Sequence, residues 1–493
     1  MVSRKKQIGY TNYFKQGIKY NFLNVSLSLL LSLSSSLILF NTLSNKDFIF
    51  YSVSQITIFF FSTAAFLEFN SLISKFFPNM DEVTSEIIIS RLIRVSIICL
   101  STIFIIYLLI SKNLNLYETF KNSANMFFLY VYVSSFIQIL SKYFGQYLSS
   151  KQKFHIQEKA YIKYSIPLRA LFLILFYYLY SNLYFVLLMV LLIRIVNLII
   201  TYKISGVKYR LNLNNKIDQK YEEIFSLSNN FKFTFKNFIF FNYPLLFFSY
   251  LPVYLRSNYS ESDIAVLTLS ISLFNAIKPF LHGIHMIINP SIQQLKFKND
   301  DKKLREIVHL FFYIINILAL FSLVFVWSIL NYIPIINILF ESFSYNLFSD
   351  LALSAIFLSL FFILNRIYHS YLLSINLENK IFLVSIFSMI FSLLFWSLFE
   401  VIGLKINLSL LIVLLYEITV FIFCQFFVFN LLGKLSYFTF VLIGVFILAL
   451  NTYFFSSFTL YLVINLLNLL LTVFLIYLVL NKLKININKI IKS

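Results

Sequence analysis

The sequence predicts an all-α membrane protein with about 14 transmembrane helices. Hydrophobic residues make up 60% of its 493 residues and charged residues only 12%, whereas about a quarter of the residues in soluble domains are charged. The apolar residues gather in fourteen stretches, most of them close to the ~20 residues that a helix needs to cross a ~30 Å hydrocarbon layer. The stretches cover residues 20–40, 48–67, 92–111, 124–148, 164–180, 183–202, 237–255, 264–289, 307–330, 347–374, 381–399, 406–430, 437–455 and 459–480.

The positive charges are distributed unevenly between alternate gaps, and this predicts the topology. Of the 40 Lys and Arg, five lie in one set of gaps, namely Lys46, Lys112, Lys121, Arg256 and Lys405. Four are assigned to helix interiors, namely Arg169, Arg194, Lys278 and Arg366. The remaining 31 lie in the other gaps, the two tails and the nearby helix ends. Because cytoplasmic loops carry an excess of Lys and Arg, both termini are expected in the cytoplasm.

The net charge of +20 is expected to face anionic lipids rather than nucleic acid. The cations are spread over eight segments and form no single basic stripe, which nucleic-acid binding would require. Cys99 and Cys424 both lie within apolar stretches, so neither a disulfide framework nor a cysteine metal site is expected. The sequence predicts no cofactor and no metal.

The longest polar stretch, residues 203–236, follows the sixth apolar stretch and predicts a domain boundary. We expect a first six-helix bundle at 1–202, a cytoplasmic linker at 203–236 and a second six-helix bundle at 237–430. A helix pair and a basic tail would follow at 431–493.

Two Ser-x-x-Asp turns suggest that the two bundles are related. Ser44 to Asp47 precede the second apolar stretch, and Ser260 to Asp263 precede the eighth. In both turns Asp is expected to cap free backbone N–H groups of the helix that follows. Because both helices would run inward, the repeat would be a parallel one, related by an axis along the membrane normal.

The eighth stretch carries the clearest candidate site. Asn275, Lys278, His282 and His285 are spaced by 3, 4 and 3 residues, which places them on one face of a helix. Lys278 would lie roughly 22 Å beyond Asp263, at ~1.5 Å per residue. A lysine at that depth costs ~2.5–3.5 kcal/mol against lipid, so this face is expected to line a wet cavity unless Lys278 reaches the interface. Two histidines without a nearby acid do not indicate a zinc site.

Further charged residues lie inside the other apolar stretches. Arg366 and His369 belong to the tenth, and Arg169 and Arg194 to the fifth and sixth, although Arg169 is also near enough to an end to reach the interface. Glu417 in the twelfth is expected either to pair with a cation or to take part in ion coupling. A mainly cationic cavity favours an anion, above all a phosphate, because Arg gives paired hydrogen bonds and Lys a point charge.

This layout resembles the polysaccharide or O-antigen flippases of the multidrug/oligosaccharidyl-lipid/polysaccharide exporter superfamily. The resemblance is carried by two six-helix bundles, the linker after the sixth helix, the two Ser-x-x-Asp turns, and Pro290-Ser291-Ile292 before a charged loop at Lys296–Glu306. The additional helix pair is similar to the fourteen-helix branch that includes lipid II flippases. Phe48 and Ile264 stand where such proteins often have Gly after the acidic turn.

The resemblance implies a MATE-like arrangement and alternating access around a central cavity. It implies that the cargo is an oligosaccharide repeat unit of O-antigen, capsule or exopolysaccharide, linked to polyprenyl pyrophosphate. Partners would be this lipid-linked substrate, membrane lipids, a polysaccharide polymerase with its chain-length machinery, and protons or Na⁺ as coupling ion. The protein would then be a transporter of lipopolysaccharide or polysaccharide biosynthesis and not an enzyme.

Two other functions are consistent with many spanning helices. A MATE-type drug or cation antiporter would need buried acids, and Glu417 is the one acid deep in a predicted helix. A membrane oligosaccharide polymerase would need a large outer loop, and the predicted outer gaps are short.

Overall fold

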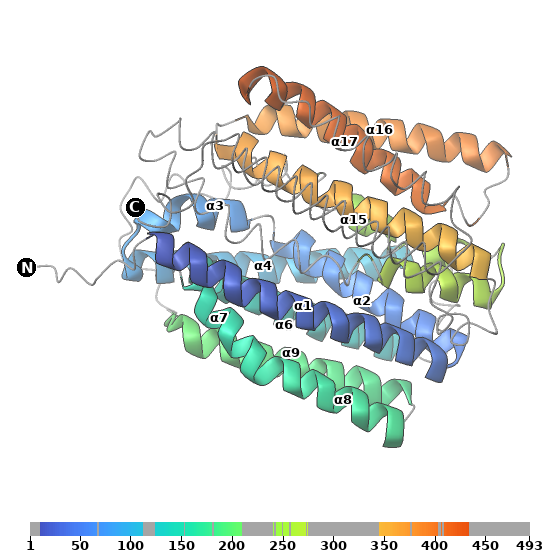
Figure 1. Cartoon of the computed structure of the whole chain (residues 1–493), viewed down its shortest axis with the longest axis horizontal. Helices are drawn as coiled ribbons and strands as arrows, with labels where there is room; N and C mark the ends of the chain where they lie inside the picture. Colours follow the sequence, from blue (N-terminus) through green and yellow to red (C-terminus); the bar gives the residue numbers. More distant parts are fainter. Residues whose placement is uncertain are drawn as a thin grey trace, which may run out of the picture. The chain divides into compact units, whose positions relative to one another are not determined.

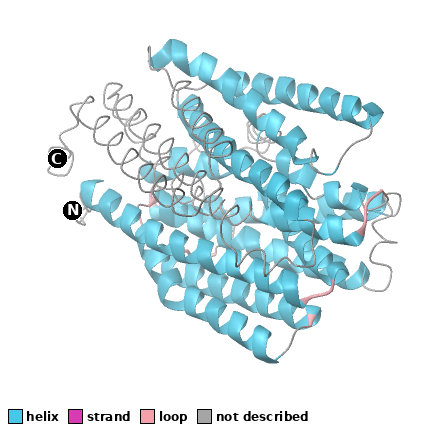
Figure 2. Ribbon diagram, turned by 45° about the vertical axis from the view of Figure 1, so that its right-hand side comes forward, coloured by secondary structure: helices cyan, strands magenta, loops and turns pink. Residues whose placement is uncertain are grey.

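The computed structural model describes residues 10–66, 69–111, 124–151, 153–179, 182–209, 240, 243–248, 250–255, 258–272, 274, 345–374, 377–402, 406 and 409–432. Within these ranges the regular structure is helical and contains no strand (Figure 2). The chain is therefore all-α in the part that the structure describes, as the sequence predicts.

Thirteen helical elements have bounds in the described part (Figure 1). The longer ones correspond to predicted apolar stretches, and most of them extend further at the polar ends. The elements are α1 (Tyr10–Thr42), α2 (Asn45–Phe66), α3 (Phe69–Phe76), the 3₁₀ turn η1 (Phe77–Asn79), α4 (Glu82–Ser111), α6 (Ala124–Ser150), α7 (Phe154–Ala160), the π-helical turn η2 (Tyr161–Ser165), α8 (Ile166–Leu179), α9 (Leu183–Ser205), α15 (Tyr345–Ser374), α16 (Glu378–Ile402) and α17 (Ser409–Leu432).

The chain forms two compact units. The first unit contains residues 13–291 and 378–389, and the second contains residues 1–12, 292–377 and 390–493. The predicted linker at 203–236 begins with the end of α9, and its residues from 210 onward lie outside the described ranges. The domain bounds proposed from the sequence therefore stay a prediction.

Six described helical segments are long and apolar enough to cross a membrane. They are Asn45–Phe66, Glu82–Leu109, Ala124–Ser150, Phe154–Tyr177, Leu183–Ser205 and Asn379–Ser397. The predicted stretches at 307–330, 437–455 and 459–480 lie outside the described residues, so the total of 14 stays a prediction. The chain is a multi-pass membrane protein.

Serine, and not aspartate, caps the helices that follow the two Ser-x-x-Asp turns. The Ser44 hydroxyl accepts a hydrogen bond from the Asp47 backbone N–H at 3.2 Å and donates to Asp47 Oδ2 at 2.8 Å. Ser260 makes the same two contacts with Asp263, at 3.2 and 2.7 Å. The prediction that Asp is the cap was wrong, because a serine hydroxyl can both accept and donate here. The two turns nevertheless have one geometry.

In the first unit α6 packs against α2, α4 and α9 (Figure 1). Its interior holds large aromatic side chains, and Tyr143 in α6 is completely buried. The Tyr143 hydroxyl is satisfied by Ser96 of α4 at 2.7 Å and by the Leu92 carbonyl at 3.1 Å. Apolar side chains on the outer faces, among them Ile98 and Leu129, are about two-thirds exposed. A helix that is apolar on all sides is expected where lipid replaces water.

Lys151 ties the turn between α3 and α4 to the end of α6. Its ammonium donates to the Phe77 carbonyl at 2.8 Å and to the Met80 carbonyl at 2.7 Å. Asp81 caps α4 by accepting from the Thr84 N–H at 2.8 Å. Partial desolvation alone would raise the pKa of Asp81, but the Thr84 hydrogen bonds and the Lys151 charge outweigh it and lower the pKa. This turn is thus held by one cation and one ionised acid.

The helix formed by α7, η2 and α8 changes its winding at Tyr161–Ser165. Pro167 follows this π-helical turn, and proline has no N–H to donate to a carbonyl one turn earlier. A π turn accommodates such a lost bond, and π turns are frequent at functional sites. The helix therefore runs from Phe154 to Leu179, starting ten residues earlier than the predicted stretch at 164–180.

The chain that leaves α9 is fastened to α4. Gly206 ends α9 with a φ of 65°, a left-handed conformation in which glycine carries no steric cost. The Lys208 backbone N–H then donates to Glu86 Oε1 at 3.1 Å, and Arg94 Nε donates to the Tyr209 hydroxyl at 3.2 Å. The first residues of the predicted linker are thus part of the first unit.

Candidate functional site

The nine candidate residues fall into three groups. Arg169 and Arg194 belong to the first unit. Arg366, His369 and Glu417 belong to the second. The four residues of the eighth stretch, Asn275, Lys278, His282 and His285, lie outside the described residues.

Arg194 of α9 is the centre of a polar cluster in the first unit. Its Nη2 donates to Gln55 Oε1 of α2 at 2.5 Å, and Gln55 Nε2 donates to the Tyr130 hydroxyl of α6 at 3.0 Å. The other terminal nitrogen, Nη1, is buried and has no hydrogen-bond partner among the described residues. A guanidinium has five donors in a planar fork. Arg194 thus keeps donor capacity inside the bundle after it has bound Gln55.

Arg169 of α8 belongs to the same cluster. It interacts electrostatically with Arg194, and Tyr51 of α2 interacts with both arginines. Arg169 lies fifteen residues beyond Phe154 and ten before Leu179, near the middle of its helix. The helix begins at Phe154, ten residues before the predicted stretch. The interactions with Tyr51 and with each other place Arg169 and Arg194 in one cluster.

A buried carboxylate that the sequence analysis missed lies in the same unit. Glu158 of α7 is 5% exposed and accepts a hydrogen bond from Asn24 Nδ2 of α1 at 2.6 Å. Ser28, one turn further along α1, contacts Asn24 Oδ1 at 3.4 Å. A buried carboxyl needs donors to remain charged, or else it takes up a proton.

Two amide oxygens in α7 and α9 add buried acceptors without donors in the described residues. Gln157 Oε1 of α7 and Asn197 Oδ1 of α9 are buried and have no hydrogen-bond partner among the described residues. The Gln157 amide lies close to Gly145 of α6, where an added Cβ would stand 3.2 Å from Nε2. Glycine at this position therefore makes room for the amide. Carbonyl and carboxylate oxygens are ligands that protons and hard cations prefer.

Tyr161 connects the carboxylate with the arginines. Its hydroxyl accepts from Gln157 Nε2 at 2.9 Å and bonds Thr201 Oγ1 of α9 at 2.8 Å. It also interacts electrostatically with both Glu158 and Arg169. Because Tyr161 opens the π-helical turn η2, a change in this winding would move the carboxylate relative to Arg169.

Lys142 of α6 is a further cation within a spanning helix, and the sequence did not single it out. Its ammonium donates to Thr63 Oγ1 at 2.8 Å and to Ser62 Oγ at 3.1 Å on α2, and it lies 4.9 Å from the centre of the Phe59 ring. Hydroxyl oxygens and an aromatic face therefore hold this charge.

In the second unit α15 packs against α17 (Figure 1). Asn365 Nδ2 donates to Glu417 Oε2 at 2.6 Å and to the Glu417 carbonyl at 2.8 Å. Both residues are almost fully buried, as is His369, one turn from Asn365. The carboxyl is thus bonded by a neutral amide that also holds the backbone of α17.

Arg366 lies one residue away from the Asn365–His369 face. Its guanidinium stacks at 4.4 Å on the ring of Phe362, one turn earlier, a contact that stabilises a cation away from water. The structure thus brings Asn365 and Glu417 together. The contact that it shows for Arg366 is the one with Phe362 in the same helix.

One signal in the sequence could have identified part of what was missed. Asn24 lies in the first apolar stretch, where an amide needs a partner from another helix. Glu158 gave no such signal, because Lys151, Lys153 and Lys159 around it indicate a polar gap.

Three solved structures of transport proteins have a similar fold. The eukaryotic MATE transporter AtDTX14 matches with a TM-score of 0.62 at 12% identity, covering 85% of this chain and 96% of that one. A point mutant of the MATE transporter VcmN of Vibrio cholerae matches with 0.62 at 11% identity, covering 85% and 98%. The lipid II flippase MurJ in an inward-closed conformation matches with 0.58 at 15% identity, covering 94% and 99%. No family model and no curated protein matches the sequence.

These comparisons establish a MATE-like fold for the chain. MurJ corresponds to 94% of its length, compared with 85% for the two MATE transporters. The predicted MATE-like arrangement is thereby confirmed at the level of the fold.

Proposed function

We propose that this protein is a flippase that moves a polyprenyl-pyrophosphate-linked oligosaccharide across the cytoplasmic membrane by alternating access. The cargo would be a repeat unit of O-antigen, capsule or exopolysaccharide. Its sugar head group would pass through the protein while the lipid tail stays in the bilayer. The greater share of the chain covered by the lipid II flippase supports this reading.

The observation that carries the proposal is the Arg169–Arg194 cluster. Two arginines interact in one cluster deep in the first unit, and Arg194 Nη1 is buried without a partner in the described residues. Like charges held together at this depth are costly unless an anion joins them. A diphosphate carries several acceptor oxygens and matches the donor fork of Arg. Arg366, His369 and the eighth-stretch residues Asn275, Lys278, His282 and His285 are the further proposed contacts.

The membrane potential suits such a cargo. Each negative charge that moves outward across an inside-negative membrane gains about 2.3 kcal/mol per 100 mV. A diphosphate with about two charges would therefore gain about 5 kcal/mol. This favours outward movement of a pyrophosphate lipid without a nucleotide-hydrolysing domain.

Glu158 and Glu417 are the proposed coupling residues for protons or Na⁺. Each is almost fully buried and each accepts a hydrogen bond of 2.6 Å from an asparagine amide. Glu158 has the stronger case, because two buried oxygens lack a partner in the described residues, that of Gln157 next to it in α7 and that of Asn197 in α9, which packs against α7. Glu417 has the weaker case, because Asn365 also donates to its backbone carbonyl and so holds α17 in place.

The alternative is a MATE-type drug or cation antiporter, and the buried Glu158 is the observation that favours it. An organic cation would need this acid at its binding site, whereas Asn24 already occupies one carboxyl oxygen. A function as an oligosaccharide polymerase is less well supported, because the solved structures with a similar fold are transport proteins.

The experiment that tests the proposal uses the full chain in liposomes. A fluorescent oligosaccharide linked to undecaprenyl pyrophosphate is added, and its transfer between leaflets is followed by a membrane-impermeant quencher. We expect transfer with the unmodified protein and loss with R194Q, while K46Q, at an exposed position in the first turn of α2, transfers normally. Transport of an organic cation without lipid transfer would instead support the antiporter.

The proposed location is the bacterial inner membrane, with both termini in the cytoplasm. The proposed partner is a polysaccharide polymerase with its chain-length machinery, which would act on the transported cargo.

A further inference from the structure

The outward side of the helix formed by α7, η2 and α8 differs from its inward side. Outward lies a stripe of exposed apolar side chains, namely Ile156, Tyr164, Leu171, Ile174 and Tyr177. They are separated by eight, seven, three and three residues, as expected for positions along one side of a helix whose winding changes at η2. Such a surface faces lipid in a membrane-spanning helix.

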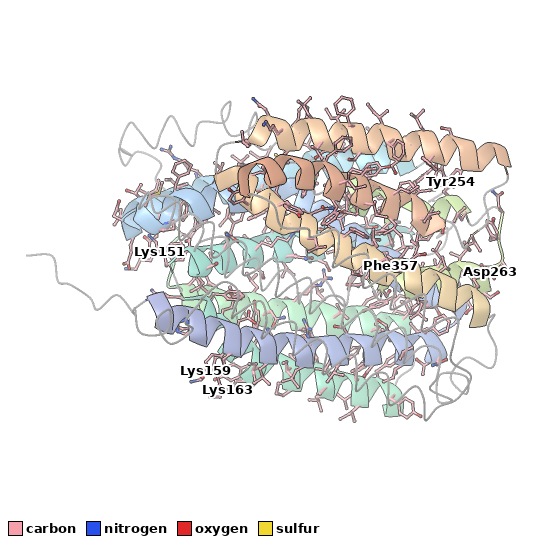
Figure 3. All side chains as sticks on the ribbon, turned by 45° about the horizontal axis from the view of Figure 1, so that its top comes forward. Lys151, Lys159, Lys163, Tyr254, Asp263 and Phe357 are labelled. Atoms are coloured by element: carbon pink, nitrogen blue, oxygen red, sulfur yellow. The ribbon has the colours of Figure 1, made fainter. Side chains whose placement is uncertain are left out.

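Two lysines interrupt this stripe at one end. Lys159 and Lys163 are both exposed, and Figure 3 shows them next to each other on the outer side of their helix. The only acid between Phe154 and Leu179 is Glu158, which is buried and bonded to Asn24. Neither lysine forms an ion pair with any residue that the structure describes. Their charge is thus presented outward and is not neutralised by the helix that carries it.

The depth of the lysines matches a lipid phosphate. The apolar part of the stripe from Tyr164 to Tyr177 spans about 20 Å at ~1.5 Å per residue, within a hydrocarbon layer of ~30 Å. The lysines lie just beyond this part, where their long side chains reach the interface. The Lys163 ammonium lies 5.1 Å from the centre of the Tyr164 ring, so the aromatic side chain holds one charge at the border between apolar and polar surface.

The position of the two lysines along the helix is also fixed. The Tyr161 hydroxyl, between them in sequence, bonds Thr201 Oγ1 of α9 at 2.8 Å. This contact fastens the π-helical turn to the neighbouring helix. The two ammonium groups therefore project from a supported segment, and a rigid site loses less entropy on binding than a mobile one.

We propose that Lys159, Lys163 and Tyr164 form a binding site for the phosphate head group of an anionic phospholipid, whose acyl chains run along Leu171 and Ile174. The site lies on the outer surface of the first unit. It is separate from the inward-facing Arg169–Arg194 cluster and is independent of the transported cargo.

The test compares lipid binding by the full chain in detergent micelles. Phosphatidylglycerol is titrated and bound lipid is counted by native mass spectrometry, for the unmodified protein and for K159Q/K163Q. Each lysine near an anionic surface contributes about 1 kcal/mol, so the tightest phosphatidylglycerol site should weaken roughly 30-fold in the double variant. The matched control K46Q/K208Q removes two exposed lysines elsewhere, and its tightest site should be unchanged.

Further arms distinguish the lipid from a free anion and from misfolding. Phosphatidylcholine should bind equally to all three proteins, and K159R/K163R should retain the tight site, which shows that charge and not disruption is responsible. Equal weakening in the control variant would overturn the site. Competition by millimolar inorganic phosphate would also overturn it, since it would assign the lysines to a soluble anion.

Discussion

Asn24 Nδ2 lies 2.6 Å from Glu158 Oε2 and so joins α1 to α7 across 134 positions of the sequence. This bond supplies a donor to a carboxyl that is 5% exposed in a membrane-spanning segment. This bond therefore links the stability of the first unit to the protonation state of Glu158.

Replacing the donor should destabilise the protein. In N24L the buried carboxyl loses its amide partner, and an unsatisfied buried polar group costs about 1–3 kcal/mol. Thermal unfolding in detergent should show a lower midpoint than for the unmodified protein. S28A removes only a 3.4 Å contact to Asn24 and serves as control. Equal midpoints for N24L and S28A would mean that the bond adds nothing.

Replacing the acid should separate folding from coupling. E158Q keeps a carbonyl that can accept from Asn24, so its unfolding midpoint should remain close to that of the unmodified protein. Because an amide does not take up a proton at neutral pH, transport in liposomes should lose its dependence on a proton or Na⁺ gradient. If E158Q responds to the gradient like the unmodified protein, Glu158 is not the coupling residue.

The arginine cluster should require planar guanidinium groups. R194K keeps the charge but loses the fork that bonds Gln55 and the anion, and hydrogen bonds to charged groups contribute about 1.5–3 kcal/mol. The rate of lipid transfer should therefore fall about tenfold or more, with normal membrane insertion shown by detergent extraction and gel filtration. R94K, at the contact with Tyr209 beyond the end of α9, is the matched control. Normal transfer by R194K would contradict the anion site.

The Asn365–Glu417 contact should be measurable as a coupling between two mutations. Since Asn365 donates to both the carboxyl and the carbonyl of Glu417, N365L and E417A should each destabilise the protein. Their combined effect should be smaller than the sum by about 0.5–3 kcal/mol, as for residues in contact. Strict additivity in thermal unfolding would show that the contact does not stabilise α15 against α17.

The cap at Asp81 should make stability depend on acid pH. The pKa of Asp81 is lowered in the folded protein, so the ionised group contributes its full stability above the unfolded pKa near 3.9. This contribution is lost as the pH falls through the lower, folded value. D81A should thus be less stable by about 1 kcal/mol at pH 7, and the difference should disappear in acid unfolding below that value. D81S keeps a capping oxygen without the charge, so the difference in stability between D81S and D81A should not depend on pH.

The fold was predictable because it depends on patterns that are local in sequence. Apolar stretches near 20 residues long predict the six spans of the described part, and bounds such as Leu183 and Ser205 for α9 differ from the prediction by three residues or fewer. The start of α7 was missed because residues 149–163 are polar and Pro167 suggests a helix beginning. Burial against α1 and α9, which depends on distant residues, extends this helix to Phe154.

The site was predictable only in part, because its contacts depend on the packing of helices that are distant in the sequence. An arginine in an apolar stretch can be recognised from the sequence, as Arg169 and Arg194 can. Their interaction with Tyr51 could not be predicted, because it arises from the packing of three helices. Glu158 is surrounded by lysines in the sequence, and only the fold separates its inward side chain from the outward Lys159. The partner of Glu417 was expected to be a cation or a transported ion, whereas the described contact is with the amide of Asn365.

The fastening of the α9 exit to α4 uses the peptide N–H of Lys208 and leaves its side chain in solvent. Natural variation at position 208 should therefore be wide, excepting proline, which has no N–H to give. The constraint falls instead on Glu86, which supplies the acceptor, and on Gly206, whose φ of 65° other residues rarely adopt. Among relatives of this chain, these two positions should vary less than the exposed lysine that their contact holds in place.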